Sequence, residues 1–150
     1  MRLTKQSNYA VRALMYCALN NNKLTRISDI AAAYSISELF LFKIIRPLVE
    51  GGLVNTIRGR NGGIELARPA ENISVFDVVT LTEDNFALAE CFDGGDTPCP
   101  LVNSCRYQSA LMRAREVFFD VLREATIAEL IGHGATIKPL LGLDVEELGS

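Results

Sequence analysis

The chain has no uninterrupted apolar run of about 18 residues, the length that a membrane-spanning helix needs. The first residues also lack the apolar core and the small-residue cleavage site of a secretory signal peptide. We therefore expect a cytoplasmic protein with no membrane partner. With 49% hydrophobic and 22% charged residues, the composition is typical of a globular protein, and 150 residues are enough for one domain with a core.

Histidine is nearly absent, since His133 is the only one in the sequence. The sequence contains neither a G-x-S-x-G motif nor a phosphate-binding P-loop. No nucleophile stands in a recognisable pattern with a base. We therefore expect a protein that is not an enzyme and has no catalytic residues.

Acidic residues are scarce in the first half of the chain. Residues 1–68 contain ten Lys or Arg and four Asp or Glu, whereas residues 69–150 contain five and fourteen. This asymmetry predicts a polyanion-binding module joined to a part that does not bind polyanions. The alternative is a chance segregation of solvated surface charge.

Helical periodicity predicts three helices in the basic half, the first over residues 3–19 and the second over residues 28–34. Ser35 and Glu38 have the spacing of a capping box, which predicts the start of a third helix that runs to about residue 50. Two glycines then stop that helix. Short helices joined by a tight turn resemble a helix-turn-helix, whose second helix lies in a major groove.

Two strand-like runs follow, at residues 53–58 and 64–67, separated by Gly59-Arg60-Asn61-Gly62-Gly63. Asn-Gly favours a hairpin in which both central residues have positive φ. A helix-turn-helix followed by a hairpin is a winged helix. The sequence therefore predicts a mainly α-helical fold, a winged helix-turn-helix with a two-stranded wing, followed by a cysteine loop and a long dimerisation helix.

Basic side chains in the predicted wing suit DNA. Arg58 and Arg60 lie at its tip, where they can bind phosphates or a narrow minor groove. The same basic half also contains Arg2, Lys5, Lys43, Arg46 and Arg68. The alternative is a hairpin with ordinary solvated arginines.

The third helix carries apolar residues beyond those with core spacing. Leu39, Phe40 and Phe42 are unusually apolar for positions that face a groove. Some of them are expected to pack internally and one to contact a thymine methyl group, but the sequence does not decide which.

Ser74 and Asp77 predict the capped start of a short helix that runs to about residue 81. Thr126 and Glu129 have the spacing of a capping box, which predicts another short helix that ends at Gly132.

A longer helix is predicted over residues 106–124, which contain neither Gly nor Pro. Leu111, Phe118 and Ala125 form a seven-residue series, with Ala114 and Val121 as a second one. This apolar surface is wider than a single packed helix needs, so we expect a second copy of the chain to cover part of it. A two-fold dimer suits a palindromic double-stranded operator.

Three of the four cysteines, Cys91, Cys99 and Cys105, are spaced C-x7-C-x5-C in a loop rich in Gly, Pro and Asp. Soft sulfur ligands in a polar loop favour a metal ion or an iron–sulfur cluster. Zinc with a bound water, or a disulfide, is the alternative, and Asp93 or Asp96 is a candidate weak fourth ligand. Cys17 lies on the apolar face of the first helix and is interpreted as a core residue.

The segments MRLTKQSNYAVRAL and LVNTIRGRNGGIELARP, with the cysteine triad before a long helix, make the chain similar to the Rrf2 family of iron–sulfur winged-helix transcription regulators. The resemblance covers roughly residues 1–131. Within the family, NYAVRALMYCA, SELFLFKII and AECF are most similar to the iron-responsive RirA type.

The resemblance implies a homodimer crossed through the long helix, with Cys91, Cys99 and Cys105 holding a cluster. A 4Fe-4S cluster is the first choice, with 2Fe-2S or 3Fe-4S as alternatives. Together with the basic residues above, it implies a DNA-contacting set, which is Arg2, Lys5, Ser37, Glu38, Leu39, Phe40, Lys43, Arg58, Arg60, Asn61, Gly62 and Gly63.

The sequence departs from two branches of the family. The IscR type places a histidine three residues after the third cysteine, where this chain has Gln108. The NsrR type uses an aspartate near the N-terminus, where this chain has Asn8. Both known fourth ligands are therefore missing, so a cluster on three thiolates would leave one iron open and easily lost.

The resemblance divides the chain into residues 1–81 as the DNA-binding domain, residues 82–105 as the cluster loop, and residues 106–150 as the dimerisation helix and C-terminal segment. It implies a repressor whose operator binding is controlled by the cluster and reports iron availability. A regulator that senses nitric oxide, oxygen or redox state is the alternative.

Overall fold

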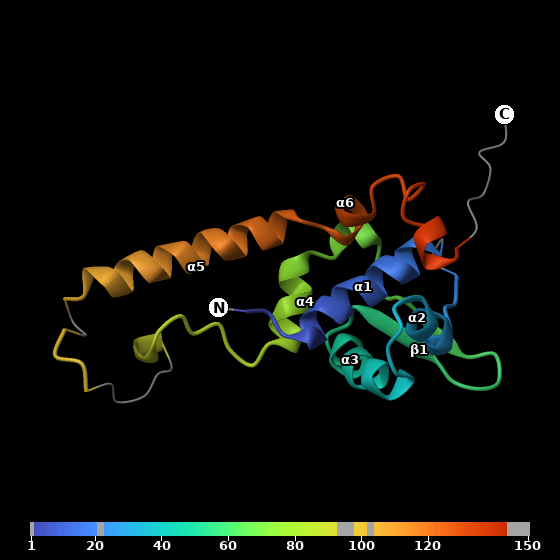
Figure 1. Cartoon of the computed structure of the whole chain (residues 1–150), viewed down its shortest axis with the longest axis horizontal. Coiled ribbons are helices and arrows are strands. Elements are labelled where there is room, and N and C mark those ends of the chain that lie inside the picture. The colour runs from blue at the N-terminus through green and yellow to red at the C-terminus, as the bar shows by residue number, and fades with distance from the viewer. Residues whose placement is uncertain (1, 21–22, 93–97, 102–103, 144–150) are drawn as a thin grey trace.

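The computed structural model describes residues 2–20, 23–92, 98–101 and 104–143, and the following account concerns those residues. The described chain is mostly helical with one two-stranded antiparallel sheet, which confirms the predicted fold class (Figure 1). The helices and strands are α1 Lys5–Leu19, α2 Ile27–Ala33, α3 Glu38–Glu50, β1 Val54–Ile57, β2 Gly63–Leu66, α4 Val75–Thr82, α5 Arg106–Glu124 and α6 Ile127–Ile131. Single 3-10 turns occur at Ala70–Asn72, Glu90–Phe92 and Pro139–Leu141.

Helix α1 lies at the centre of the core and packs against α3, α4 and α6. Its apolar residues Ala10, Leu14 and Cys17 are fully buried, as their spacing predicts. The helix begins after Thr4, whose hydroxyl oxygen accepts a hydrogen bond from the Ser7 N–H at 3.2 Å. The prediction that Cys17 is a core residue is confirmed.

The turn between α2 and α3 differs from the prediction. Ser35 does not cap α3, because it lies in the left-handed region with φ 53°, whereas a helix N-cap needs extended backbone. Ser37 is the N-cap, and its Oγ accepts a hydrogen bond from the Phe40 N–H at 3.1 Å. The Ile36 N–H donates to the Ala31 carbonyl at 3.0 Å and closes the turn. The turn geometry, rather than the spacing of Ser35 and Glu38, therefore decides where α3 begins.

The predicted hairpin is confirmed, but its turn is different. Ile57 pairs with Gly63, so the loop has the expected five residues but covers residues 58–62, one position earlier than predicted. The positive φ falls at Gly59 (112°), and the Gly62 N–H donates to the Gly59 carbonyl at 2.9 Å. Asn61 and Gly62 therefore do not form the predicted tight turn, since a five-residue loop reverses the chain with only one left-handed residue. Thr25 extends the sheet by bridging to Ile64.

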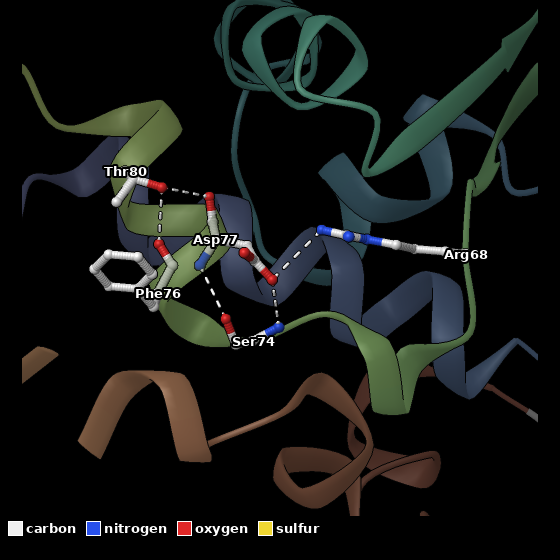
Figure 2. Close-up of polar contacts among 5 residues, drawn as sticks. All are labelled: Arg68, Ser74, Phe76, Asp77 and Thr80. Atoms are coloured by element: carbon white, nitrogen blue, oxygen red, sulfur yellow. Dashed lines mark hydrogen bonds and ion pairs between the residues drawn. The ribbon is translucent and has the colours of Figure 1, made fainter. Parts of the chain in front are cut away.

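Helix α4 begins with a complete capping box, as predicted. Ser74 Oγ accepts a hydrogen bond from the Asp77 N–H at 3.1 Å, and Asp77 Oδ2 accepts one from the Ser74 N–H at 3.0 Å (Figure 2). The same Asp77 oxygen lies 3.4 Å from Arg68 Nη2. The chain that leaves the wing is thereby tied to α4. The capping box predicted at Thr126 and Glu129 is also present, at the start of α6.

Helix α5 has the predicted bounds and extends away from the body formed by α1–α4 (Figure 1). None of its residues is buried, and Val117 and Val121 are 62% and 58% exposed. Helix α6 then returns to the body, where Ile127 is fully buried in the same core as α1. No helix in the described parts of the chain is long and apolar enough to cross a membrane.

Candidate nucleic-acid interface and cysteine loop

Helix α3 separates a buried face from an exposed face. Its buried residues are Leu41, Ile44, Ile45 and Leu48. Leu39, Lys43 and Arg46 follow at intervals of four and three residues, so they form one row on the opposite side of the helix. All three are exposed, and Leu39 is 71% exposed. This row is the side of α3 that faces away from the core.

The two other apolar side chains of α3 have different surroundings. Phe40 is half-buried, and its ring packs edge-on against Tyr9 at 5.8 Å between centroids. Phe42 is 55% exposed and lines a cleft of about 530 Å³ between α3 and the wing, together with Glu38, Ile57 and Arg58. Phe40 therefore anchors α3 to α1, whereas Phe42 is available beside the outer row.

The helix-turn-helix is held in place by aromatic contacts. The Tyr34 hydroxyl donates a hydrogen bond to the Arg12 carbonyl at 3.1 Å, and its ring lies 6.5 Å from those of Tyr9 and Tyr16. Burial raises the pKa of Tyr34 to about 12, so the hydroxyl stays protonated and keeps donating. These contacts fix the orientation of the turn relative to α1.

The wing presents its predicted residues as an exposed tip. Arg58, Arg60 and Asn61 are exposed. Gly62 and Gly63 are half-buried, and a Cβ at Gly63 would collide with the backbone of Thr25. The two glycines therefore shape the hairpin, and the side chains available for contact come from the other three residues.

The predicted residues at the N-terminus lie apart from the wing tip, since α1 begins near the middle of the view and the wing loop lies at its right-hand side (Figure 1). Arg2 lines a pocket with Glu83–Ala87, the segment that follows α4. Lys5 is exposed in the first turn of α1. Ser37, Glu38 and Lys43 are exposed at the start of α3, and Ser37 Oγ is used in the helix cap.

The cysteine loop lies at the far end of α5 from the body (Figure 1). All four cysteines are free, with Cys99 exposed and with Cys91 and Cys105 half-buried. Cys105 is the N-cap of α5, and its Sγ accepts a hydrogen bond from the Gln108 N–H at 3.3 Å. The Arg115 guanidinium lies 5.0 Å from the ring centre of Phe92, which holds the loop against α5.

The residues present fit an iron–sulfur cluster by their chemistry, because three free thiols are soft ligands for iron. The structure does not bring them together, since within the described residues no group of three His, Cys, Asp or Glu is placed to hold a metal ion. The candidate ligands Asp93 and Asp96 lie outside the described residues. The ligand set therefore stays a prediction.

The family model for Rrf2, described as an iron-dependent transcriptional regulator, matches residues 3–133. The chain belongs to the Rrf2 family. This Rrf2 regulator is 59% identical to protein aau3 of Rhizobium meliloti over 96% of its own length and 94% of the relative. It is 44% identical to the HTH-type transcriptional regulator NsrR of Geobacillus kaustophilus, over 94% and 97% of the two chains.

Solved structures support the same fold for this Rrf2 regulator. The oxidised form of CymR from Staphylococcus aureus superposes with a TM-score of 0.69 at 26% identity, covering 88% of this chain and 97% of that one. The family consists of transcription regulators, and the winged helix is its DNA-binding element. The finer assignment to the RirA type stays a prediction.

Sequence reasoning left three residues out of the candidate set. Arg46, counted from the sequence only among the basic residues of the first half, lies in the outer row of α3, because it follows Leu39 by seven residues. Phe42 is one of the three apolar residues whose surroundings the sequence does not decide, and only the structure places it in the cleft beside the wing. Glu83 accepts hydrogen bonds from the first turn of α1, and no local pattern signals a contact between residues 79 positions apart.

Proposed function

We propose that this Rrf2 regulator is a repressor that binds palindromic operator DNA as a homodimer, and that an iron–sulfur cluster controls this binding in response to iron. The observation that carries the DNA-binding part is the shared surface of α3 and the wing. Lys43 and Arg46 lie on the outer row of α3, and Arg58 and Arg60 lie at the wing tip. A helix in the major groove and basic residues on the flanking phosphates would bind DNA together.

The exposed surface of α5 supports the homodimer. Val117 and Val121 are more than half exposed. Neighbouring apolar side chains in contact with water are unfavourable, so another surface is expected to cover them. A mainly apolar groove of about 400 Å³ lies beside the C-terminal end of α5, lined by Val11 and Met15 of α1 and Val79 of α4. A second copy of the chain supplies an apolar helix to cover such surfaces, and the two-fold axis would set the spacing of two wings.

Cys91, Cys99 and Cys105 would hold the cluster, for which 4Fe-4S is the first choice. A bound cluster would hold the three cysteines of the loop in one arrangement. That constraint would exist only while iron is available. Asn8 is a poor ligand for iron, because a neutral amide replaces the carboxylate of the NsrR type, and its Nδ2 donates a hydrogen bond to the Thr4 carbonyl at 2.9 Å. With Gln108 at the other family position, the fourth coordination site would be open, which makes the cluster easy to lose.

The proposal is tested with protein purified anaerobically from iron-replete cells. We expect visible absorbance from the cluster and tight binding to the operator measured by fluorescence anisotropy. Titration with an iron chelator should remove both together. Equal operator affinity of the cluster-bound and cluster-free proteins would contradict the control by iron, whereas absence of any sequence-specific binding would contradict the repressor itself.

Sensing of nitric oxide or redox state is the second candidate, and the 44% identity to a regulator named NsrR favours it. The two signals are separated by adding nitric oxide anaerobically, at constant iron, to one half of the sample and a chelator to the other. If the protein releases DNA at low nitric oxide concentrations, while the half treated with chelator keeps its DNA bound, the second candidate is favoured.

A further inference from the structure

The first turns of α3 carry an unusual combination of exposure and apolarity. Leu39 is the second residue of the helix and is 71% exposed, and Phe42 follows three residues later with 55% exposure. Residues three apart on a helix are neighbours, so the two side chains form one apolar surface. Basic side chains continue the same exposed side of the helix at Lys43 and Arg46.

Glu38 and Lys43 are the exposed polar side chains beside this surface whose side chains are not engaged in a described contact, whereas the other neighbours already have partners within the chain. Ser37 Oγ accepts the Phe40 N–H as the helix cap. Phe40 turns to Tyr9 of α1, and Arg46 Nε lies 2.9 Å from Glu50 Oε1. The residues near the N-terminus of a recognition helix are those that contact base edges. Leu39 and Phe42 therefore occupy positions from which a recognition helix contacts base edges, although neither side chain can form a hydrogen bond.

We propose that Leu39, with Phe42 beside it, is a specificity-determining residue that reads the 5-methyl groups of thymines in the major groove. The C5 methyl group of thymine is the one apolar feature that a base pair presents in that groove. The positive charges at Lys43, Arg58 and Arg60 complement the phosphates on either side, which selects duplex DNA as the occupant of this surface. This inference rests on the proposed DNA-binding function.

The predicted consequence is a preference for thymine that depends on one methyl group. Burial of a methyl group against an apolar side chain favours binding by about fourfold, and contact with two methyl groups would multiply this factor. Cytosine or uracil at the same positions lacks the methyl group. The half-site should therefore contain at least one thymine whose methyl group contributes to affinity.

The experiment first selects an operator from random duplexes, using the anaerobically purified full-length protein. Each thymine of that operator is then replaced by deoxyuridine, which removes only the methyl group and keeps every hydrogen-bonding atom. We expect the wild-type protein to lose about fourfold in affinity at one or two positions of each half-site. Leu39→Ala should bind the unmodified operator at least about fourfold more weakly and should lose the thymine–uracil difference at one of these positions.

Phe42→Ala should lose the difference at a neighbouring position. Leu140→Ala is the matched control, since Leu140 is 81% exposed in the C-terminal 3-10 turn, and it should keep the full difference. Thermal unfolding of each variant checks that the fold is retained, as expected for substitutions at exposed positions.

Two results would overturn the inference without affecting the proposed function. One is an operator that binds tightly but shows no loss at any uracil position. The other is a Leu39→Ala variant that keeps the wild-type thymine–uracil difference at every position, or that changes the oligomeric state in the absence of DNA, which would mean that Leu39 covers a protein surface. Failure to select any operator would instead contradict the proposed function, and the inference with it.

Discussion

The carboxylate of Glu83 accepts two hydrogen bonds from Thr4, one from its N–H at 2.7 Å and one from its hydroxyl at 3.0 Å. The Ser7 hydroxyl donates to the same oxygen and also lies 2.8 Å from the Thr82 hydroxyl. The end of α4 thus holds the first turn of α1, where a negative charge is favourable. The segment that leads to the cysteine loop starts directly after this contact.

Replacing Glu83 with Gln should make the protein less stable at neutral pH. Burial raises the pKa of Glu83, but hydrogen bonds from Ser7 and Thr4 outweigh it, and the pKa lies below its ordinary value. A lowered folded-state pKa gives stability that is complete above the unfolded-state pKa and is lost as pH falls below about 4.3. We expect Glu83→Gln to lower Tm at pH 7 and to flatten the fall of Tm in acid. The same change at exposed Glu71 is the control, and identical curves for the two variants would contradict the role of Glu83.

Replacing Cys99 with Ala should remove the visible absorbance of anaerobically purified protein while leaving the helical content unchanged. Cys99 is exposed in the loop and contributes little to packing. Cys17→Ala is the control, because burial raises the pKa of Cys17 to about 12 and keeps it an unreactive core thiol. That variant should keep the absorbance but lose roughly 1–2 kcal/mol of unfolding free energy through the cavity it leaves. Cluster absorbance in Cys99→Ala would remove Cys99 from the ligand set.

Replacing Arg60 with Ala should weaken binding to all DNA sequences by a similar factor. If the guanidinium contacts one phosphate, the slope of log K against log salt should fall by about one unit. The measurement is fluorescence anisotropy over a range of salt concentrations. Arg113→Ala, an exposed arginine of α5, should leave the slope unchanged. A loss of affinity confined to one operator sequence would instead mean that Arg60 reads bases.

Replacing Val117 with Glu should shift the protein toward the monomer. A charge placed in an apolar interface loses its hydration without gaining a partner, so we expect the dimer dissociation constant to rise by about tenfold or more. Sedimentation velocity over a concentration series measures this change. Leu140→Glu introduces the same charge at a more exposed apolar residue outside α5 and should not alter self-association. Unchanged dimerisation of Val117→Glu would place the interface elsewhere.

Local signals predicted most of the fold. The capping boxes at Ser74 and Thr126, the bounds of α5 and the hairpin all follow from patterns within a few residues, and the structure confirms them. The failures lie where two local patterns compete. Ser35 and Ser37 both have the chemistry of a helix cap, and only the left-handed backbone needed by the turn excludes Ser35. In the wing, the length of the loop rather than its Asn-Gly pair determines the turn.

The candidate site was predictable only in part. Residue type and spacing predicted that α3 and the wing hairpin carry the candidate DNA-binding surface. The helical period identifies the outer row of α3. Phe40 is half-buried and Phe42 is exposed because of the elements that lie beside α3 in space. Tyr9 comes from a helix about 30 positions earlier, so no local pattern assigns its contact with Phe40.

The extension of α5 has a quantitative consequence for any signal from the cysteine loop. A helix of 19 residues spans roughly 28 Å, and the loop lies at its far end. If two chains must associate before the loop affects the wings, the response obeys mass action. A cell with too few copies of the protein would then have isolated subunits that register the signal without transmitting it. The number of molecules per cell would set the sensitivity of repression alongside iron supply.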